Sequence, residues 1–146
     1  MEGQLEDVVL VETASLRGHE EVIPDNLETR TAKLLSKGFY KPIIVDRESM
    51  VILDGHHKWT AATSLGLARV PVILVDYLID EGVLVDVWPE CGKESITKTE
   101  VLEMGVSGDV FPPKTSRHTL PFKIPSIRIP PVSYTHLTLP TNKAVE

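Results

Sequence analysis

Five short apolar runs, rich in the β-branched residues Val and Ile, constrain the fold of this chain more than any other feature. Runs of this length and composition are typical of buried β-strands. The turn 47–49 separates the second run from the third, so we expect a hairpin there. The five runs are Val8–Glu12, Pro42–Asp46, Met50–Leu53, Val70–Tyr77 and Val83–Trp88.

Helical segments lie between these runs. From Asp25 to Ser36 the apolar residues approximate one helical face, Asp25 or Asn26 is placed to cap its start, and Gly38 to end it. The segment 59–65 favours a second helix that ends at Gly66, and 98–104 a short third one closed by Gly105. Strands and helices are therefore intermixed, which predicts an α+β fold with a mixed sheet and flanking helices.

Bulk composition limits the possible functions. The chain has 146 residues, 42% of them hydrophobic, which fits one globular domain. A formal net charge of −6 argues against a surface that neutralises nucleic-acid phosphates. Cys91 is the only cysteine, which excludes an intrachain disulfide and a CxxC site. The acidic start lacks the basic residues of a secretory signal, and no apolar run reaches membrane-spanning length. We therefore expect a cytoplasmic protein.

The last part of the chain has a different character. Residues 132–141 show neither helical nor clean strand periodicity, and their back-translation resembles the transposon end and adapter used to prepare sequencing libraries. We therefore predict a domain over residues 1–131 and a non-native tail over 132–146, in which Tyr134 and His136 are not site residues. A genuine disordered tail is the alternative.

The segment Asp54–Lys58 carries the clearest chemical pattern. Gly55 lets the backbone approach a ligand, and the following helix presents free N–H groups and the positive end of its dipole. His56, His57 and Lys58 supply donors for phosphate oxygens, and Asp54 is suited to hold Mg²⁺. A tight turn whose histidines cap the helix and contact solvent is the alternative. A metal site with two histidines is disfavoured because adjacent side chains on a helix point apart.

Three segments around this turn, 41–46, 51–58 and 65–67, resemble the ParB/sulfiredoxin-like superfamily. Within it, Gly18–Glu20, Asp54–His57 and Pro113–Phe122 are most similar to the free serine kinases. The chain differs from that family's usual pattern in having Lys58 in place of Arg and Gly18 in place of Pro. Lysine supplies a point charge and not the bidentate fork of arginine.

The resemblance implies a kinase that transfers a phosphoryl group from ADP or ATP, with Mg²⁺, to the hydroxyl of free L-serine and forms O-phosphoserine. It implies that Asp54, Gly55, His56, His57 and Lys58 bind the nucleotide phosphates, with Asp54 and His57 also catalytic. Glu20 would be the base that accepts the hydroxyl proton. Without the resemblance, Glu20 reads as one of two solvated glutamates in a turn. The phosphate turn does not distinguish ADP, ATP and CTP.

The segment 113–122 is expected to bind the amino acid. The planar fork of Arg117 suits a substrate carboxylate, and Thr115, Ser116 and His118 are donors beside it. Lys114 is placed to assist. The alternative is an exposed polar loop held by the prolines. Trp88 either lines the substrate pocket or belongs to the core. A buried or incidental thiol is the better interpretation of Cys91.

Two other functions of this superfamily fit the sequence less well. A ParB-like module for DNA partition or transcription is opposed by the acidic charge, by the lack of a following helix-turn-helix segment and by the lack of a basic cluster. A sulfinic-acid reductase needs a nucleophilic cysteine in the phosphate turn, where this chain has His56. The expected partners are therefore a nucleotide and a small amino acid.

Overall fold

The computed structural model describes residues 7–127. Every predicted strand run forms a strand, and one further strand lies in the segment 113–122, where the sequence predicted none. The elements in chain order are β1 (Val8–Glu12), a 3₁₀ turn (Thr13–Ser15), α1 (Pro24–Lys37), β2 (Ile43–Asp46), β3 (Ile52–Asp54), α2 (His56–Ser64), β4 (Arg69–Val75), β5 (Leu84–Val87), α3 (Lys98–Ser107) and β6 (Ser116–Thr119).

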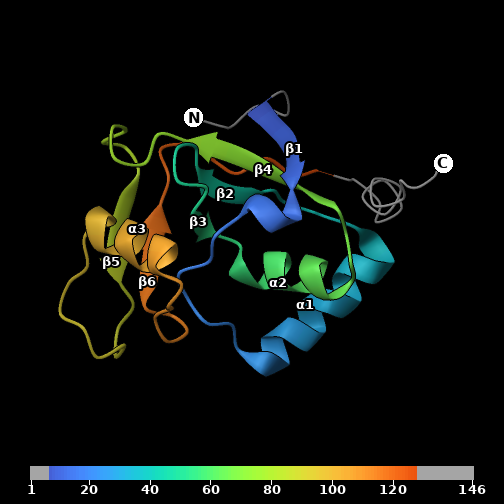
Figure 1. Cartoon of the computed structure of the whole chain (residues 1–146), viewed down its shortest axis with the longest axis horizontal. Coiled ribbons are helices and arrows are strands. Elements are labelled where there is room, and N and C mark those ends of the chain that lie inside the picture. The colour runs from blue at the N-terminus through green and yellow to red at the C-terminus, as the bar shows by residue number, and fades with distance from the viewer. Residues whose placement is uncertain (1–6, 128–146) are drawn as a thin grey trace.

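The main sheet has four strands in the order β1-β4-β2-β3 (Figure 1). Strand β2 runs parallel to β4, while β1 is antiparallel to β4 and β3 is antiparallel to β2. The sheet is therefore mixed, and the predicted hairpin joins β2 to β3. Strands β5 and β6 form a separate antiparallel ribbon.

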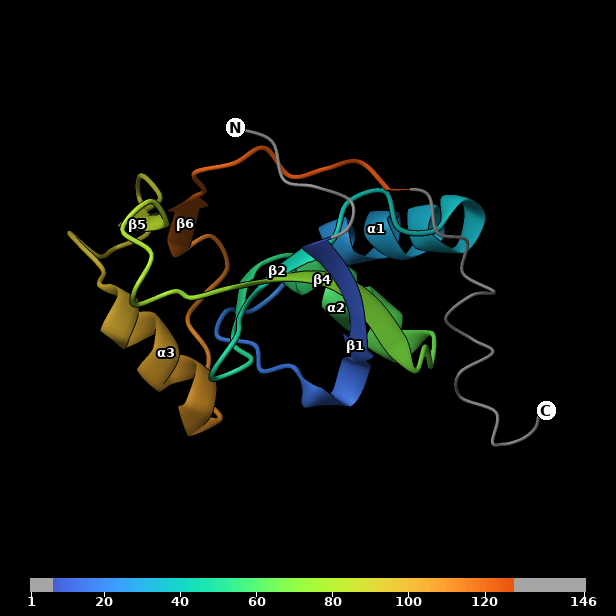
Figure 2. The ribbon, with the colours of Figure 1, turned by 90° about the horizontal axis from the view of Figure 1, so that it is seen from above.

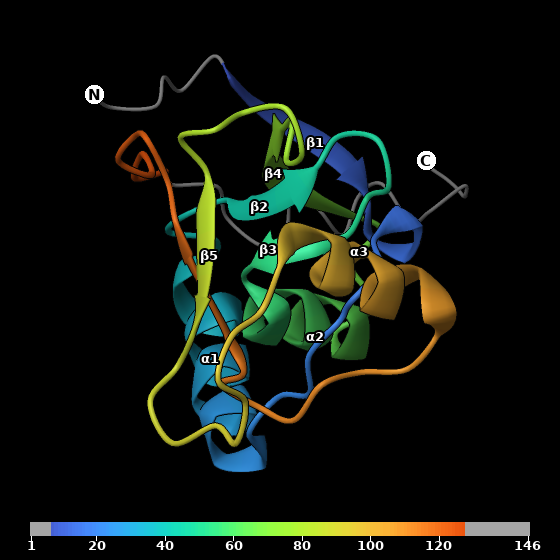
Figure 3. The same ribbon diagram turned by 90° about the vertical axis from the view of Figure 1, so that its left-hand side faces the viewer.

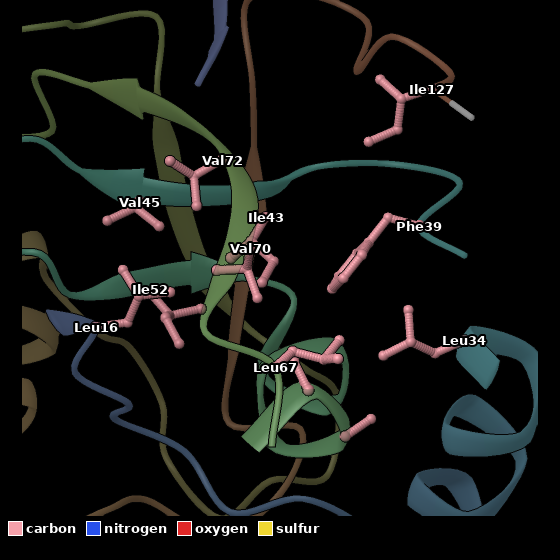
Figure 4. Close-up of a cluster of buried hydrophobic side chains, with 12 residues drawn as sticks. Leu16, Leu34, Phe39, Ile43, Val45, Ile52, Leu67, Val70, Val72 and Ile127 are labelled. Atoms are coloured by element: carbon pink, nitrogen blue, oxygen red, sulfur yellow. The ribbon is translucent and has the colours of Figure 1, made fainter. Parts of the chain in front are cut away.

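Both faces of the sheet are covered, which explains why the strand runs are almost continuously apolar. Side chains alternate along a strand, so Ile43 and Val45 enter one core cluster and Ile44 enters the other. Figure 4 shows the first cluster, where Leu34 of α1 and Phe39 approach the sheet. The second cluster is covered by α3 and the β5–β6 ribbon, which lie across the sheet from α1 and α2 (Figures 2 and 3).

Helix boundaries differ from the predictions in three places. Helix α1 is not capped by Asp25 or Asn26, because it begins one residue earlier with Pro24 at its first position and Ile23 at the N-cap. Proline suits that position because an N–H at the first position of a helix would have no partner within the helix. Helix α2 already begins at His56 and not at residue 59. Helix α3 does not close at residue 105, since it continues to Ser107.

Gly105 has a packing role inside α3. A Cβ atom at this position would lie 2.6 Å from Cγ2 of Val51, closer than two carbons pack. The helix starts with a capping box, in which Thr97 and Glu100 bond each other's backbone N–H, and it ends at Gly108. The absence of a side chain at Gly105 therefore lets α3 pack directly against Val51, the residue before β3.

Two sequence expectations concern the ends and the surroundings of the chain. No helix between residues 7 and 127 is long and apolar enough to cross a membrane. The predicted non-native tail over 132–146 lies outside the described residues.

Candidate functional site

The turn from β3 into α2 has the predicted geometry. Gly55 is the N-cap of α2 with φ of 109°, a left-handed conformation that favours glycine, and no side chain caps the helix. A Cβ at residue 55 would lie 3.1 Å from Cγ1 of Ile43. The free N–H groups and the positive dipole end of α2 are therefore available to an anion.

The two histidines of this turn hold another segment of the chain. Nε2 of His56 accepts the backbone N–H of His19 at 3.1 Å, and Nε2 of His57 accepts the backbone N–H of Ile23 at 3.0 Å. A neutral imidazole whose Nε2 accepts carries its proton on Nδ1. Only the Nδ1 atoms therefore remain as phosphate donors in this arrangement, whereas the sequence suggested donation without this restriction.

Burial and neighbouring charges keep both rings neutral. Burial is the main cause that lowers the pKa of His56 well below its usual value, and the nearby His19, His118 and His57 add to it. Burial also lowers the pKa of His57, with smaller contributions from the positive charges of Arg30 and Lys114. An imidazole that stays neutral can keep accepting a backbone N–H near pH 7.

A cavity of about 290 Å³ lies beside the phosphate turn, between α1, α2 and the loop before β2. Sequence reasoning missed three of its four basic residues, although Arg30 and Lys33 lie three apart on one helix. Burial lowers the pKa of Lys58, the carboxylate of Asp54 opposes that shift, and Arg30 and Lys41 reinforce it. The cavity is lined by Arg30, Lys33, Leu34, Gly38, Phe39, Tyr40, Lys41 and Lys58.

The carboxylate of Glu20 is held by the loop before β6. Oε2 accepts the N–H of Lys114 at 3.1 Å, and Oε1 accepts the N–H groups of Thr115 at 3.1 Å and Ser116 at 2.9 Å. The hydroxyl of Ser116 donates to Oε1 at 3.1 Å. The backbone of Glu20 also forms a parallel bridge to Phe111. The fold therefore brings together the predicted base and two predicted substrate-binding residues, Thr115 and Ser116.

Behind Glu20 lie two histidines, of which His19 is buried and His118 is half-buried. Nε2 of His19 lies 2.9 Å from Oγ of Ser116, and Nε2 of His118 lies 2.8 Å from the hydroxyl of Tyr77. Burial lowers the pKa of His19 to about 4, against a smaller opposing effect of a backbone hydrogen bond with Ile52. Burial likewise lowers the pKa of His118 to about 3. These rings are therefore neutral hydrogen-bonding groups above about pH 5.

The remaining predicted substrate residues lie on different faces of β6. Strand side chains alternate, so Ser116 and His118 face the core, while Arg117 is exposed on the other face. The guanidinium of Arg117 lies over the ring of Trp88, 5.1 Å from its centroid. Nε1 of Trp88 donates to the carbonyl of Ser116 at 3.0 Å.

The hydroxyl of Thr115 donates to the carbonyl of Pro112 at 2.7 Å and is thus already engaged. The clamp role of Arg117 stays a prediction.

A resident metal centre is not built into the part of the chain that the structure describes. Between residues 7 and 127, no group of three or more His, Cys, Asp or Glu side chains is arranged to hold a metal ion. Asp54 is an exposed single carboxylate at the end of β3. One carboxylate together with nucleotide phosphates is a usual environment for Mg²⁺, so Asp54 fits an ion that arrives with the nucleotide.

Parts of this sequence are similar to known proteins. No family model matches the chain. A ParB-like protein of Sulfolobus acidocaldarius is 46% identical over 67 residues, which are 46% of this chain and 34% of that protein. An ATP-dependent L-serine kinase of Staphylothermus marinus is 38% identical over 85 residues, which are 55% of this chain and 33% of that protein. The chain thus spans about a third of the length of these curated relatives.

Solved structures extend the likeness across most of the domain. A free serine kinase in complex with AMP superposes with a TM-score of 0.77 at 22% identity, covering 88% of this chain and 93% of that one. The fold is that of the free serine kinases. The predicted α+β class, with a mixed sheet and flanking helices, is confirmed.

Proposed function

We propose that this chain transfers a phosphoryl group from ADP or ATP to the hydroxyl of free L-serine. One observation carries the proposal: the three segments that resemble the free serine kinases meet in space. The N–H of His19 bonds His56 of the phosphate turn, and the carboxylate of Glu20 bonds the loop 114–116. Relatives named L-serine kinases, and free serine kinase structures that contain AMP or ADP, support the same activity.

In this proposal the nucleotide phosphates lie against the first turn of α2. The helix N-terminus and the ammonium of Lys58 stabilise the negative charge, and Arg30, Lys33 and Lys41 extend the positive field into the adjacent cavity. Mg²⁺ carried by the phosphates would meet Asp54 and would neutralise charge on the transferred group. The nucleotide base then occupies space beside α1, which gives the cavity a role that the sequence did not indicate.

Glu20 receives the proton of the serine hydroxyl in this mechanism. The oxygen of the substrate attacks the terminal phosphorus of the nucleotide, the bond to the leaving nucleotide breaks, and the hydroxyl proton passes to the carboxylate of Glu20. The N–H groups of Lys114, Thr115 and Ser116 hold this carboxylate in one orientation. Ser116 and His118 on the core face of β6, or Arg117 and Trp88 on its outer side, are the groups proposed to contact the amino acid.

The decisive experiment is incubation of the protein with Mg²⁺, L-serine and either ADP or ATP, followed by detection of O-phosphoserine by mass spectrometry. The His57→Ala and Lys58→Ala variants should bind nucleotide more weakly in titration calorimetry, with Ser64→Ala on the exposed side of α2 as the control. Failure of the wild-type protein to form O-phosphoserine with either nucleotide would overturn the proposed function. Unchanged nucleotide affinity in both variants would overturn the assignment of the phosphate turn.

A ParB-like role in DNA binding is the second candidate, because one relative named ParB-like is 46% identical over 67 residues. The net charge of −6 opposes it, since duplex binding depends on many Lys and Arg contacts with phosphates. Filter binding with duplex DNA at low salt tests this candidate. Retention of DNA at micromolar protein, with a steep loss on adding salt, would favour it over the kinase.

A further inference from the structure

The segment that carries Glu20 is neither helix nor strand, and it contains only isolated β-bridges. Residues 17–23 cross from the 3₁₀ turn to α1 between the phosphate turn and the loop before β6. Their conformation therefore depends on hydrogen bonds to other parts of the chain. Two of these bonds come from consecutive residues of α2, because His56 accepts the N–H of the residue before Glu20 and His57 accepts the N–H of Ile23, three residues after it.

Both bonds require imidazole rings in one protonation state. A doubly protonated ring has only donors, so it can accept a backbone N–H only while it is neutral. The two hydrogen bonds show both rings in the accepting state. His57 is partly buried, and the positive charges of Arg30 and Lys114 lie nearby, so its surroundings oppose a second proton on the ring.

We propose that His56 and His57 are positioning residues that fix the Glu20 segment against the phosphate turn. His56 anchors the residue before Glu20 and His57 anchors a residue after it, so that both help to place the carboxylate that the loop 114–116 orients. This proposal rests on the proposed kinase function, and it assigns the two histidines a task beyond contact with phosphate. It also explains why two histidines stand next to each other: their side chains diverge, and each reaches a different amide of the same segment.

The same rings connect the base to the nucleotide. With Nε2 of His57 accepting from Ile23, the proton on Nδ1 is free to donate to a phosphate oxygen. Donation at one nitrogen makes the other a better acceptor, so a bound phosphate strengthens the hold on Ile23. Nucleotide binding is therefore coupled to the placement of Glu20, because a bound phosphoryl donor reinforces a contact that holds the segment of the base.

His57 is the residue to test, because it is only partly buried and its replacement is less disruptive than that of the buried His56. Three variants distinguish the role of Nε2 of His57 from that of Nδ1. The amide oxygen of His57→Gln reaches close to the Nε2 position and can accept from Ile23. His57→Asn is too short for that contact but keeps a donor near Nδ1. His57→Phe keeps the ring and removes both groups. Ser64→Ala, on the exposed side of α2, is the control.

The first measurement needs neither nucleotide nor serine. Hydrogen exchange of the Ile23 amide, followed by NMR, should be about 3- to 10-fold faster in His57→Phe and His57→Asn than in the wild type and in His57→Gln. Thermal unfolding of each variant checks that the fold is retained. Equal exchange of the Ile23 amide in all four proteins would overturn the proposal, whether or not the protein is a kinase.

The second measurement is phosphoserine formation, with kcat and KM determined separately. If the ring positions Glu20, His57→Phe should lower kcat about 10- to 100-fold, and His57→Gln should recover a large part of that loss. If the ring serves only the phosphate, His57→Asn should be the better replacement and the loss should appear in the KM for nucleotide. Absence of wild-type activity refutes the proposed kinase, while the exchange experiment still decides the role of His57.

Discussion

The two walls of the candidate site are built in different ways. One wall is the turn Asp54–Lys58, in which adjacent residues supply the N-cap, the two histidines and a lysine. The other wall joins Glu20 to a loop about 95 residues later, since the three N–H groups that bond its carboxylate belong to residues 94 to 96 positions away. A local motif predicts the first wall, whereas only the folded chain reveals the second.

The walls also differ in charge. Basic side chains gather at the α1 and α2 side, where Arg30, Lys33, Lys41 and Lys58 line one cavity. The other side holds neutral groups behind Glu20, because burial keeps His19 and His118 uncharged near pH 7. The basic wall suits a polyphosphate, and the uncharged rings behind Glu20 leave its carboxylate as the group on that side that can accept the hydroxyl proton.

Replacement of Glu20 tests the second wall and has the largest expected effect. The Glu20→Gln variant keeps the size of the side chain but removes the base, so kcat for phosphoserine formation should fall by about 10²- to 10⁴-fold. Nucleotide affinity should stay near the wild-type value, since the phosphates lie at the first wall. Steady-state kinetics and calorimetric titration with ADP measure the two quantities.

The neighbouring Glu21 is the matched control for this experiment. Its side chain is exposed and its backbone N–H bonds Phe111, so Glu21→Gln leaves the segment in place. Turnover of Glu21→Gln should remain close to that of the wild type. A Glu20→Gln enzyme with most of its turnover, or an equal loss in Glu21→Gln, would show that the base has been assigned to the wrong residue.

Acid should destabilise the folded protein through His19 and His118. The pKa of His19 falls from 6.5 to about 4 on folding and that of His118 from 6.5 to about 3, so the unfolded chain binds more protons than the folded one below pH 6.5. Stability is therefore fully present above pH 6.5 and decreases as the pH falls toward the folded pKa values. At pH 5 the loss is about 2 kcal/mol for each of the two histidines.

Urea unfolding at pH 7, 6 and 5 measures this loss before most carboxylates titrate. In the His118→Phe variant, the ring that replaces the imidazole cannot bind a proton, so its free energy of unfolding should change less between pH 7 and pH 5. The comparison uses differences within each protein, so any constant cost of losing the hydrogen bond to Tyr77 cancels. Parallel curves for the two proteins would contradict the assigned cause.

The contrast between the walls also shows what the sequence could and could not predict. Strand runs were recognisable because both faces of the sheet are buried, and Gly55 marked the phosphate turn because the left-handed N-cap needs a glycine. Strand β6 was missed because its residues Ser116–Thr119 are polar, and its partner β5 lies about 30 residues earlier in the chain. The acceptor roles of His56 and His57 depend on segment 17–23, whose path no local rule determines.

Replacement of Gly105 or Gly55 should lower the stability of the protein, but only one of the two changes should affect the phosphate turn. Gly105→Ala places a Cβ 2.6 Å from Val51, which should cost about 1–3 kcal/mol of stability by overpacking while leaving the phosphate turn unaffected. Gly55→Ala forces alanine into a left-handed conformation against Ile43 and should cost a similar amount. Only the second change should also weaken nucleotide binding, because residue 55 is the N-cap of α2.

Urea denaturation and nucleotide titration of both variants distinguish the two effects. Gly108→Ala is a useful reference, since Gly108 also has a left-handed φ of 91° but no atom lies within 4 Å of a Cβ built there. Its loss of stability therefore reports the backbone conformation alone. If Gly105→Ala is no less stable than the wild type, α3 does not pack on Val51 as closely as described.

Arg117 offers the smallest expected effect and addresses which side of β6 meets the amino acid. Its guanidinium is exposed and lies over Trp88, whereas Ser116 and His118 face the core. If Arg117 clamps the serine carboxylate, Arg117→Ala should raise the KM for serine about tenfold, which is the loss of one charge-assisted hydrogen bond, and leave the KM for nucleotide unchanged. Arg117→Lys should recover part of this loss, because it restores the charge without the bidentate fork. Steady-state kinetics with serine varied at saturating nucleotide make the measurement. A wild-type KM for serine in Arg117→Ala would show that Arg117 does not bind the serine carboxylate. An increase confined to the KM for nucleotide would instead assign Arg117 to the nucleotide site.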